Sequence, residues 1–248
     1  MENQFFNINN LKRLLYIVVV MAAAMSCSDD DPQPSVENAK FSLADSAPIA
    51  LPSAITLSED EHAQMVVGWA MSANAMTSYT ALFTPPAGAE KSTTAITPSN
   101  GRTKGTNEDV VVYTWSQQGF GSIAYQIRDL SDKFAFEVLI KDEGSADWYR
   151  HVYAEEKKDG SVGFMEFYAG EEVAMRWDWT RSGSTLAIDF STGEAGLSYS
   201  FVIDTNTSAG SIIVMDGEEK IYESTWTAAG TGTWKEYFDG ELVASGEW

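Results

Sequence analysis

The chain has little of the chemistry on which most enzymes rely. Its 248 residues include one cysteine, Cys27, and two histidines, His62 and His151. A catalytic triad would have to use one of these histidines, and no G-x-S-x-G motif supplies a nucleophile. Clustered cysteine and histidine, which bind zinc, and glycine-rich phosphate loops are also lacking. We therefore predict a non-enzymatic protein without catalytic residues, metal or cofactor.

Positive charge is scarce as well. The chain holds 16 lysine and arginine residues against 36 aspartate and glutamate residues, a net charge of −20. Nucleic-acid binding needs a basic surface, so this composition argues against a nucleic-acid partner. A single cysteine allows no disulfide within the chain, so stability has to come from a packed core.

Carboxylates are abundant, and two patterns among them suggest chemistry. Glu166 lies between Phe164 and Tyr168 in a predicted strand, where a glycosidase-like pair of acids would need a partner ~5–10 Å away. A solvent-facing glutamate is the simpler interpretation. Residues 204–210 carry oxygen atoms at alternate positions, as calcium loops do, but Ala209 stands where such a loop requires glycine. Asx-turn hydrogen bonding accounts for this segment better.

No apolar run near the N-terminus is long enough for a permanent membrane span. The uncharged run Leu14–Met25 follows the basic pair Lys12 and Arg13. As a helix it would rise only ~18 Å, well short of the ~30 Å hydrocarbon core of a bilayer. This pattern predicts that residues 1–26 are a cleaved secretory signal peptide.

The end of this run carries a specific signal. The sequence Ala24-Met25-Ser26-Cys27 resembles the lipobox of bacterial lipoproteins, with a small residue before the cysteine. The resemblance implies that Cys27 becomes the first residue of the mature chain and carries acyl groups that anchor it in the membrane. The alternative is ordinary cleavage near Ala24 that leaves a free thiol.

Three acidic residues, Asp29, Asp30 and Asp31, follow the cysteine almost at once. This run resembles the surface-export signal of lipoproteins of the Bacteroidota group. The resemblance implies a lipid-anchored protein of the outer membrane that faces the cell exterior. The alternative is a solvated acidic spacer.

The distribution of proline predicts the domain organisation. All seven prolines precede residue 99. Proline cannot donate a hydrogen bond to a β ladder, so the proline-free remainder suits hydrogen-bonded strands. We expect residues 27–53 to form an acidic, proline-containing tether and residues 54–248 to form a single domain.

The domain is expected to begin with one α-helix over about 58–82. Ser58-Glu59-Asp60-Glu61 is a capping-box pattern, and Pro85-Pro86 ends any helix. A stripe of large apolar residues at helical spacing would face the rest of the domain, with small residues on the opposite face. The stripe consists of Met65, Trp69, Met76, Tyr79 and Phe83, and the small residues include Ala63 and Ala70.

From about residue 110 to 248 the pattern changes to strict alternation. Phe134, Phe136, Val138 and Ile140 alternate with polar residues, and turn pairs such as Asp159-Gly160 and Asp216-Gly217 recur about every ten residues. Short strands joined by tight turns predict an antiparallel meander. So mainly β structure is expected, with about 12 strands curled into a barrel or half-barrel and the N-terminal helix packed on or in it.

An internal repeat runs through the meander. Trp179 and Gly183 recur 47 residues later as Trp226 and Gly230, and Trp115 begins a third copy of the unit. The shared unit is a tryptophan, three small or polar residues and then a glycine. We interpret it as a device of hairpin construction, in which the tryptophan packs over the neighbouring strand, and not as a binding motif.

Three functions remain open for the mature domain. An envelope lipoprotein that binds an apolar or other small ligand in the concavity of the sheet is favoured, and Met65, Trp69, Met76, Met175 and Trp177 are the candidate lining residues. A surface glycan-binding or glycan-degrading protein is the first alternative, which would need exposed aromatic rings. A structural or adhesive surface protein is the second.

Overall fold

The computed structural model describes residues 35–42, 48–100, 109–117, 121–193 and 196–248. All of them belong to one compact unit, Pro34–Trp248. The predicted lipidation site Cys27 and the acidic residues Asp29, Asp30 and Asp31 lie outside the described residues, so signal peptide, anchor and surface display stay predictions.

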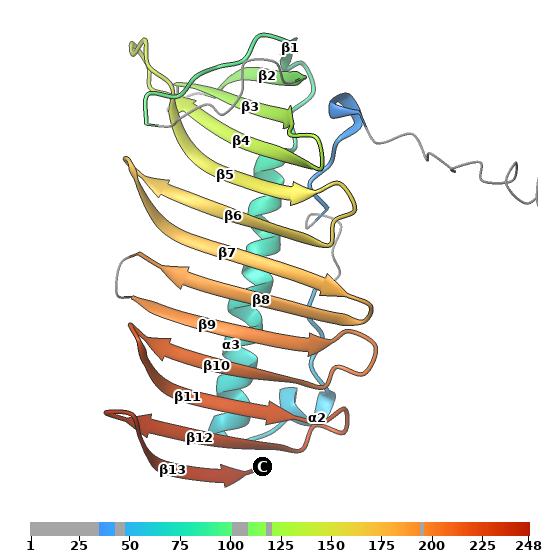
Figure 1. Ribbon diagram of the computed structural model, residues 1–248, viewed down its shortest axis with the longest axis vertical. Helices are drawn as coiled ribbons and strands as arrows, with labels where there is room; N and C mark the ends of the chain where they lie inside the picture. The colour runs from blue at the N-terminus through green and yellow to red at the C-terminus, as the bar shows by residue number, and fades with distance from the viewer. Residues whose placement is uncertain (1–34, 43–47, 101–108, 118–120, 194–195) are drawn as a thin grey trace, which may run out of the picture. The chain divides into compact units, whose positions relative to one another are not determined.

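A single antiparallel sheet makes up most of the unit, with its strands in sequence order (Figure 1). The strands are β1 (Glu90–Ser92), β2 (Val110–Gln117), β3 (Gly121–Asp129), β4 (Lys133–Lys141), β5 (Tyr149–Lys157), β6 (Val162–Ala169), β7 (Glu172–Ser182), β8 (Thr185–Thr192), β9 (Leu197–Asp204), β10 (Gly210–Asp216), β11 (Glu219–Trp226), β12 (Gly232–Phe238) and β13 (Glu241–Glu247). The predicted mainly β fold with an antiparallel meander is confirmed, and the short β1 precedes its expected start. The sheet stays open, because β1 and β13 pair with each other nowhere.

The helix predicted over about 58–82 corresponds to two elements, α3 (Glu61–Tyr79) and the 3₁₀ helix η3 (Thr80–Phe83). A short helix that was not predicted, α2 (Ser53–Thr56), precedes them. The cap of α3 is Asp60 and not Ser58, because Asp60 Oδ1 accepts hydrogen bonds from the backbone N–H groups of His62 at 2.9 Å and Ala63 at 3.1 Å.

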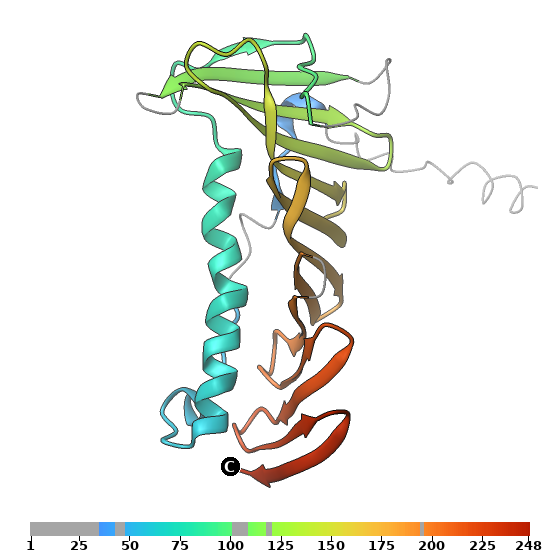
Figure 2. The same cartoon turned by 90° about the vertical axis from the view of Figure 1, so that its left-hand side faces the viewer.

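α3 runs along one face of the sheet and crosses its strands (Figure 2). Near its start, the ring of His62 stacks on Trp234 of β12, with 3.4 Å between centroids. Midway, Trp69 lies 5.3 Å from Tyr199 of β9, and at its end Tyr79 lies 4.7 Å from Phe167 of β6. We call the face that α3 covers the inner face.

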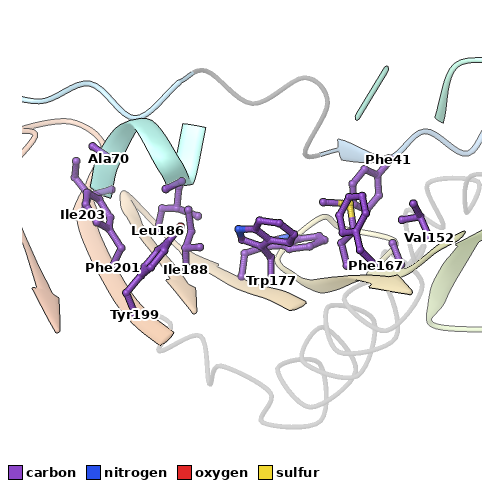
Figure 3. Close-up of a cluster of buried hydrophobic side chains, with 14 of the residues drawn as sticks. Phe41, Ala70, Val152, Phe167, Trp177, Leu186, Ile188, Tyr199, Phe201 and Ile203 are labelled. Atoms are coloured by element: carbon purple, nitrogen blue, oxygen red, sulfur yellow. The ribbon is translucent and has the colours of Figure 1, made fainter. Parts of the chain in front are cut away.

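The predicted orientation of the helix is wrong in part. Trp69 and Phe83 of the predicted stripe pack in the core, but Met65 of the stripe is exposed, and apart from His62 the side chains that α3 buries are small. The reason is volume: the inner face already carries large rings, so only small helix side chains let the two elements approach closely. The small residues that α3 buries are Ala63, Val66, Ala70 and Ala73. The large inner-face residues include Trp179 and, labelled in Figure 3, Phe167, Trp177, Tyr199 and Phe201.

The stretch before α3 also covers the inner face. The 3₁₀ helix η1 spans Val36–Asn38 and buries Val36, and Phe41 is only 2% exposed. Phe41 contacts Phe136 and Trp179 with centroid distances of 5.2 and 5.4 Å. Residues 35–42 and 48–53 therefore belong to the domain, which corrects the prediction that the tether extends to residue 53.

Trp179 and Trp226 of the predicted repeat pack over the neighbouring strand, as predicted, whereas Trp115, the predicted third copy, is paired with Ile123 of β3. Each of Trp179, Trp226 and Trp248 covers a glycine sixteen residues earlier on the paired strand. A Cβ atom on that glycine would lie 2.1–2.6 Å from the indole ring, so only glycine leaves room. The three glycines are Gly163, Gly210 and Gly232. Trp226 and Trp248 also donate indole hydrogen bonds, to the carbonyls of Ser208 at 2.8 Å and Gly230 at 2.9 Å.

Close to β2, β3 and β4 the outer face of the sheet is covered as well. Ile96 packs there against a second buried cluster formed by Val112, Ala124 and Leu139. The Gln126 side chain makes two hydrogen bonds to the backbone of Ile96. It accepts one from the Ile96 N–H at 2.7 Å and donates one to the Ile96 carbonyl at 3.2 Å. These strands are thus buried on both faces.

Candidate functional site

A cavity with aromatic walls lies where the chain around Phe41 meets the first strands. Its volume is about 490 Å³, within the range of small-molecule sites. Apolar side chains form most of its wall, four of them aromatic rings, and Glu37 and Lys40 contribute charge. The apolar lining residues are Ala39, Phe41, Phe83, Pro85, Tyr113, Tyr125 and Ile127. We call this space the aromatic cavity.

The rings of the aromatic cavity are held by packing. Phe41 and Phe83 lie 4.6 Å apart between centroids, Phe83 and Tyr125 lie 5.8 Å apart, and Tyr113 stacks on Tyr125 at 6.3 Å. Burial raises the pKa of the Tyr125 phenol, which therefore stays neutral. The wall is consequently rigid and uncharged, apart from Glu37 and Lys40.

A second, more polar cavity adjoins the first. It has a volume of about 370 Å³ and is lined by four cationic residues, Lys40, Lys157, Lys158 and Arg181. Two carboxylates, Glu156 and Asp159, complete its charged lining. We call it the basic cavity. Lys158 is paired with Asp129 at 2.9 Å and lies over the ring of Phe134.

The two carboxylates of the basic cavity have different surroundings. Glu156 is 3% exposed and accepts hydrogen bonds from the backbone N–H of Ser42 at 2.8 Å and from its hydroxyl. Burial raises the pKa of Glu156, against the opposing effect of the Ser42 hydrogen bonds. Asp159 is solvent-exposed, and its hydrogen bonds from Ser161 lower its pKa.

The five residues predicted to line a ligand site are not brought together at these cavities. Trp177 is buried and packs on Phe167 and Phe190, at 5.4 and 4.7 Å. Trp69 and Met175 pack against the same core, and Met65 is 38% exposed. Met76 lies in α3, and its side chain is outside the described part of the chain. The rings of the inner face and the small side chains of α3 fill the space that the prediction assigned to a ligand.

Glu166, the one candidate acid, is engaged in an ion-pair network on the outer face. It accepts a hydrogen bond from the Tyr168 hydroxyl at 2.7 Å and pairs with Arg176. Arg176 also binds Asp178, with Nε–Oδ2 and Nη2–Oδ1 distances of 2.7 and 2.6 Å. Since one guanidinium holds both carboxylates, their geometry is that of a salt-bridge cluster on the sheet surface.

Six aromatic residues could stack on sugar rings if they were exposed, but most of them are covered: Trp148, Tyr149, Tyr153, Trp177, Trp234 and Tyr237. Each of the eight tryptophans is at least half-buried in the structure. On the outer face the guanidinium of Arg150 lies 4.6 Å from the ring of Tyr153 and 5.7 Å from that of Tyr168. Tyr149 is the exposed member of the set at 44%. A flat platform of exposed tryptophans for sugar stacking is therefore not formed by the described residues.

The calcium-like segment is an Asx turn, as expected. Asp204 Oδ1 accepts hydrogen bonds from the backbone N–H groups of Asn206 at 2.9 Å and Thr207 at 2.8 Å. Ser184 donates to Asp204 Oδ2 at 2.6 Å. The described residues contain no group of three or more histidine, cysteine and acidic side chains that could hold a metal ion. Among them, no helix has the length and apolar character needed to cross a membrane.

Comparisons with protein-family models and with curated proteins found no match. The candidate site therefore rests on its geometry alone. Sequence reasoning missed Phe41 and Lys40 because their stretch was assigned to the tether. The apolar residues Val36, Phe41, Ile49 and Leu51 within that stretch were the available signal.

Proposed function

We propose that the protein is a non-enzymatic, lipid-anchored protein of the outer membrane that binds a small, largely apolar ligand in the aromatic cavity. The anchor rests on the lipobox-like sequence before Cys27, and the outward orientation on Asp29, Asp30 and Asp31. The binding role rests on one observation, the cavity of about 490 Å³ walled by Phe41, Phe83, Tyr113, Tyr125 and Ile127.

Physical reasoning supports an apolar occupant. Moving apolar surface from water into contact with such rings contributes roughly 25 cal/mol per Å² buried. The walls are fixed by ring packing at 4.6–6.3 Å, so little ordering is required when a ligand enters. Preformed, mostly apolar cavities with a few polar groups are typical of small-molecule sites.

Filling the cavity tests the binding role. Thr84 lines the aromatic cavity and is exposed, so Thr84→Trp places an indole ring there without removing a core side chain. With decanol as the probe in isothermal titration calorimetry, we expect at least about tenfold weaker binding by this variant. Thr205→Trp, at an exposed turn after β9, is the control and should bind as the parent does. The proposal is contradicted if the parent, Thr84→Trp and Thr205→Trp bind decanol equally, or if none of them binds it.

The anchor is tested separately. Cys27→Ser removes the acceptor for acyl groups, so the variant should lose metabolic labelling with palmitate and leave the membrane fraction. Replacing Asp29, Asp30 and Asp31 with asparagine should keep the label but protect the domain from protease added to intact cells. A labelled Cys27→Ser protein would contradict the anchor.

An adhesive role is the second candidate, and one observation favours it. Phe238, Leu242 and Val243 are exposed by 69%, 53% and 60% around the turn between β12 and β13. Grouped exposed apolar side chains often mark a contact surface. Replacing Leu242 and Val243 with serine should abolish cell-surface attachment if this role is correct, and should leave decanol binding unchanged.

A further inference from the structure

The aromatic cavity and the basic cavity have a common wall. Asn38, Ala39 and Lys40, at the end of η1 and just after it, line both. A ligand in the aromatic cavity is therefore close to a second cavity of different chemistry. Lys40 is the charged residue that belongs to both.

The charge around the basic cavity is opposite to that of the chain as a whole. Four cationic residues and two carboxylates line it, whereas the complete chain has 16 basic and 36 acidic residues. Random placement would give an acidic lining. A local excess of cations in so acidic a protein points to an anionic occupant.

The neighbouring acids offset only part of this excess. Asp129 pairs with Lys158 at 2.9 Å, and Glu37, which lines the aromatic cavity, pairs with Lys91 of β1 at 3.0 Å. Glu156 is held toward Ser42, from which it receives two hydrogen bonds. Lys40 is exposed and makes no ion pair among the described residues, so its ammonium group is available to a ligand.

Building on the proposed function, we propose that the ligand is an amphiphilic anion. Its apolar chain or ring system lies in the aromatic cavity, against Tyr113 and the packed rings of Phe41 and Phe83, and its single anionic group contacts Lys40 where the two cavities meet. The remaining cations of the basic cavity add attraction at longer range. An amphiphilic anion is the expected ligand because an apolar wall lies next to the positive charge of Lys40.

Salt should weaken the long-range electrostatic contribution to this binding more than the short-range one. The net charge of −20 repels any anion at long range, and this repulsion is screened beyond ~8 Å at physiological ionic strength. The contact with Lys40 is short and less screened. Experiments at about 0.15 M salt therefore report the local contact and not the field of the whole chain.

The test compares decanoate and decanol, two probes with the same ten-carbon chain and a charged or an uncharged head group, by isothermal titration calorimetry with the complete protein. We expect decanoate to bind the parent about tenfold more tightly than decanol, since hydrogen bonds to charged groups are the stronger ones. In Lys40→Gln this preference should fall to within about twofold, chiefly through weaker binding of decanoate.

The matched control is Lys235→Gln, which removes the same charge from β12, where Lys235 pairs with Glu223. It should keep the tenfold preference, and Lys40→Arg should keep most of it. Equal affinities of the parent for the two probes would overturn the amphiphilic anion but leave the proposed apolar site intact. A preference that survives in Lys40→Gln would also overturn it. Absence of binding by both probes would overturn the two proposals together.

Discussion

β4, near one end of the sheet, and β13, at the other edge, are strands of similar length that are covered very differently. β4 buries residues of both faces, such as Phe136 on the inner face and Glu137 on the outer face, which are 0% and 1% exposed. β13, at the opposite edge, has no fully buried residue. Both ends are antiparallel and continuous with the same sheet, so the difference lies in what covers them and not in strand geometry.

At the covered end, burial extends to charged groups. The Glu137 carboxylate pairs with Arg128 at 3.1 Å and with Arg150 at 2.5 Å, and it accepts a hydrogen bond from Gln126 at 2.6 Å. At the open end, Glu223 plays a comparable part at the surface. It pairs with Lys220 and Lys235, both at 2.7 Å, and accepts a hydrogen bond from Tyr237 at 2.8 Å.

The comparison separates two ways of stabilising a single sheet. The Trp-over-Gly pairs need only the inner face and so can be repeated toward the open end. The first strands are instead covered by segments that are not part of the meander. Residues around Ile96 cover their outer face, and residues around Phe41 cover their inner face. Because the segment around Phe41 does not fill all the space next to the strands, the aromatic and basic cavities remain between them. The covered end is therefore where we place ligand binding.

The largest expected effect comes from removing the buried carboxylate. Glu137→Ala leaves Arg128 and Arg150 buried without their partner, which should lower the free energy of unfolding by about 3–5 kcal/mol. Glu223→Ala, the surface counterpart, should cost about 1 kcal/mol or less. Urea denaturation at pH 7 measures both. Similar losses for the two variants would remove the distinction between the ends.

A smaller effect is expected for the glycines under the tryptophans. In Gly163→Ala the new Cβ would lie 2.3 Å from the buried Trp179 ring and 2.7 Å from the Glu155 carbonyl oxygen, so overpacking should cost about 1–3 kcal/mol. In Gly246→Ala of β13 the nearest atom, on Trp234, is 2.8 Å away. We expect a loss below about 1 kcal/mol there, because an edge strand can shift.

Gly193→Ala is the control for this pair, since no atom lies within 4 Å of the added Cβ. Its midpoint of urea denaturation should equal that of the parent. If Gly246→Ala proves as costly as Gly163→Ala, the open end is packed as tightly as the centre.

The smallest expected effect depends on pH. Hydrogen bonds from Lys220 and Lys235 lower the pKa of Glu223 to about 2, from an ordinary value of 4.5. A carboxylate whose pKa is lower in the folded state stabilises the fold above its ordinary pKa and loses that contribution as the pH falls toward about 2. The stability difference between the parent and Glu223→Gln should thus be present at pH 7 and shrink between pH 4.5 and 2. A difference that does not vary with pH would show that the ion pairs contribute nothing.

Much of the fold could be predicted from the pattern of residues. Alternation in segments such as Phe134–Ile140, with regular turn glycines, predicted the meander. Gly160, Gly170 and Gly217 do adopt positive φ values of 69°, 69° and 60°. One turn differs, because Gly210 starts β10 and the left-handed residue before it is Ser208, with a φ of 62°. Strand patterns and turn chemistry are local, which is why they can be read from neighbouring residues.

The candidate site could not be predicted in the same way. Phe41 reaches Phe136 and Trp179, residues about a hundred positions or more away, through contacts that no local pattern announces. α3 likewise packs small side chains against the inner face, because the aromatic rings of the sheet fill most of the space between sheet and helix. Size, and not hydrophobicity, decided which stripe of α3 was buried.

The sequence by itself determined the composition of the strands, the tight turns and the repeated pairing of tryptophan with glycine. It also carries the lipobox-like signal at Cys27, on which the proposed anchor depends. Only the tertiary structure decided that the sheet stays open, which face of α3 is buried, and that Lys40 stands between an aromatic and a basic cavity. Those outcomes depend on how the volumes and charges of distant segments fit together, and such a fit exists only once the chain has folded.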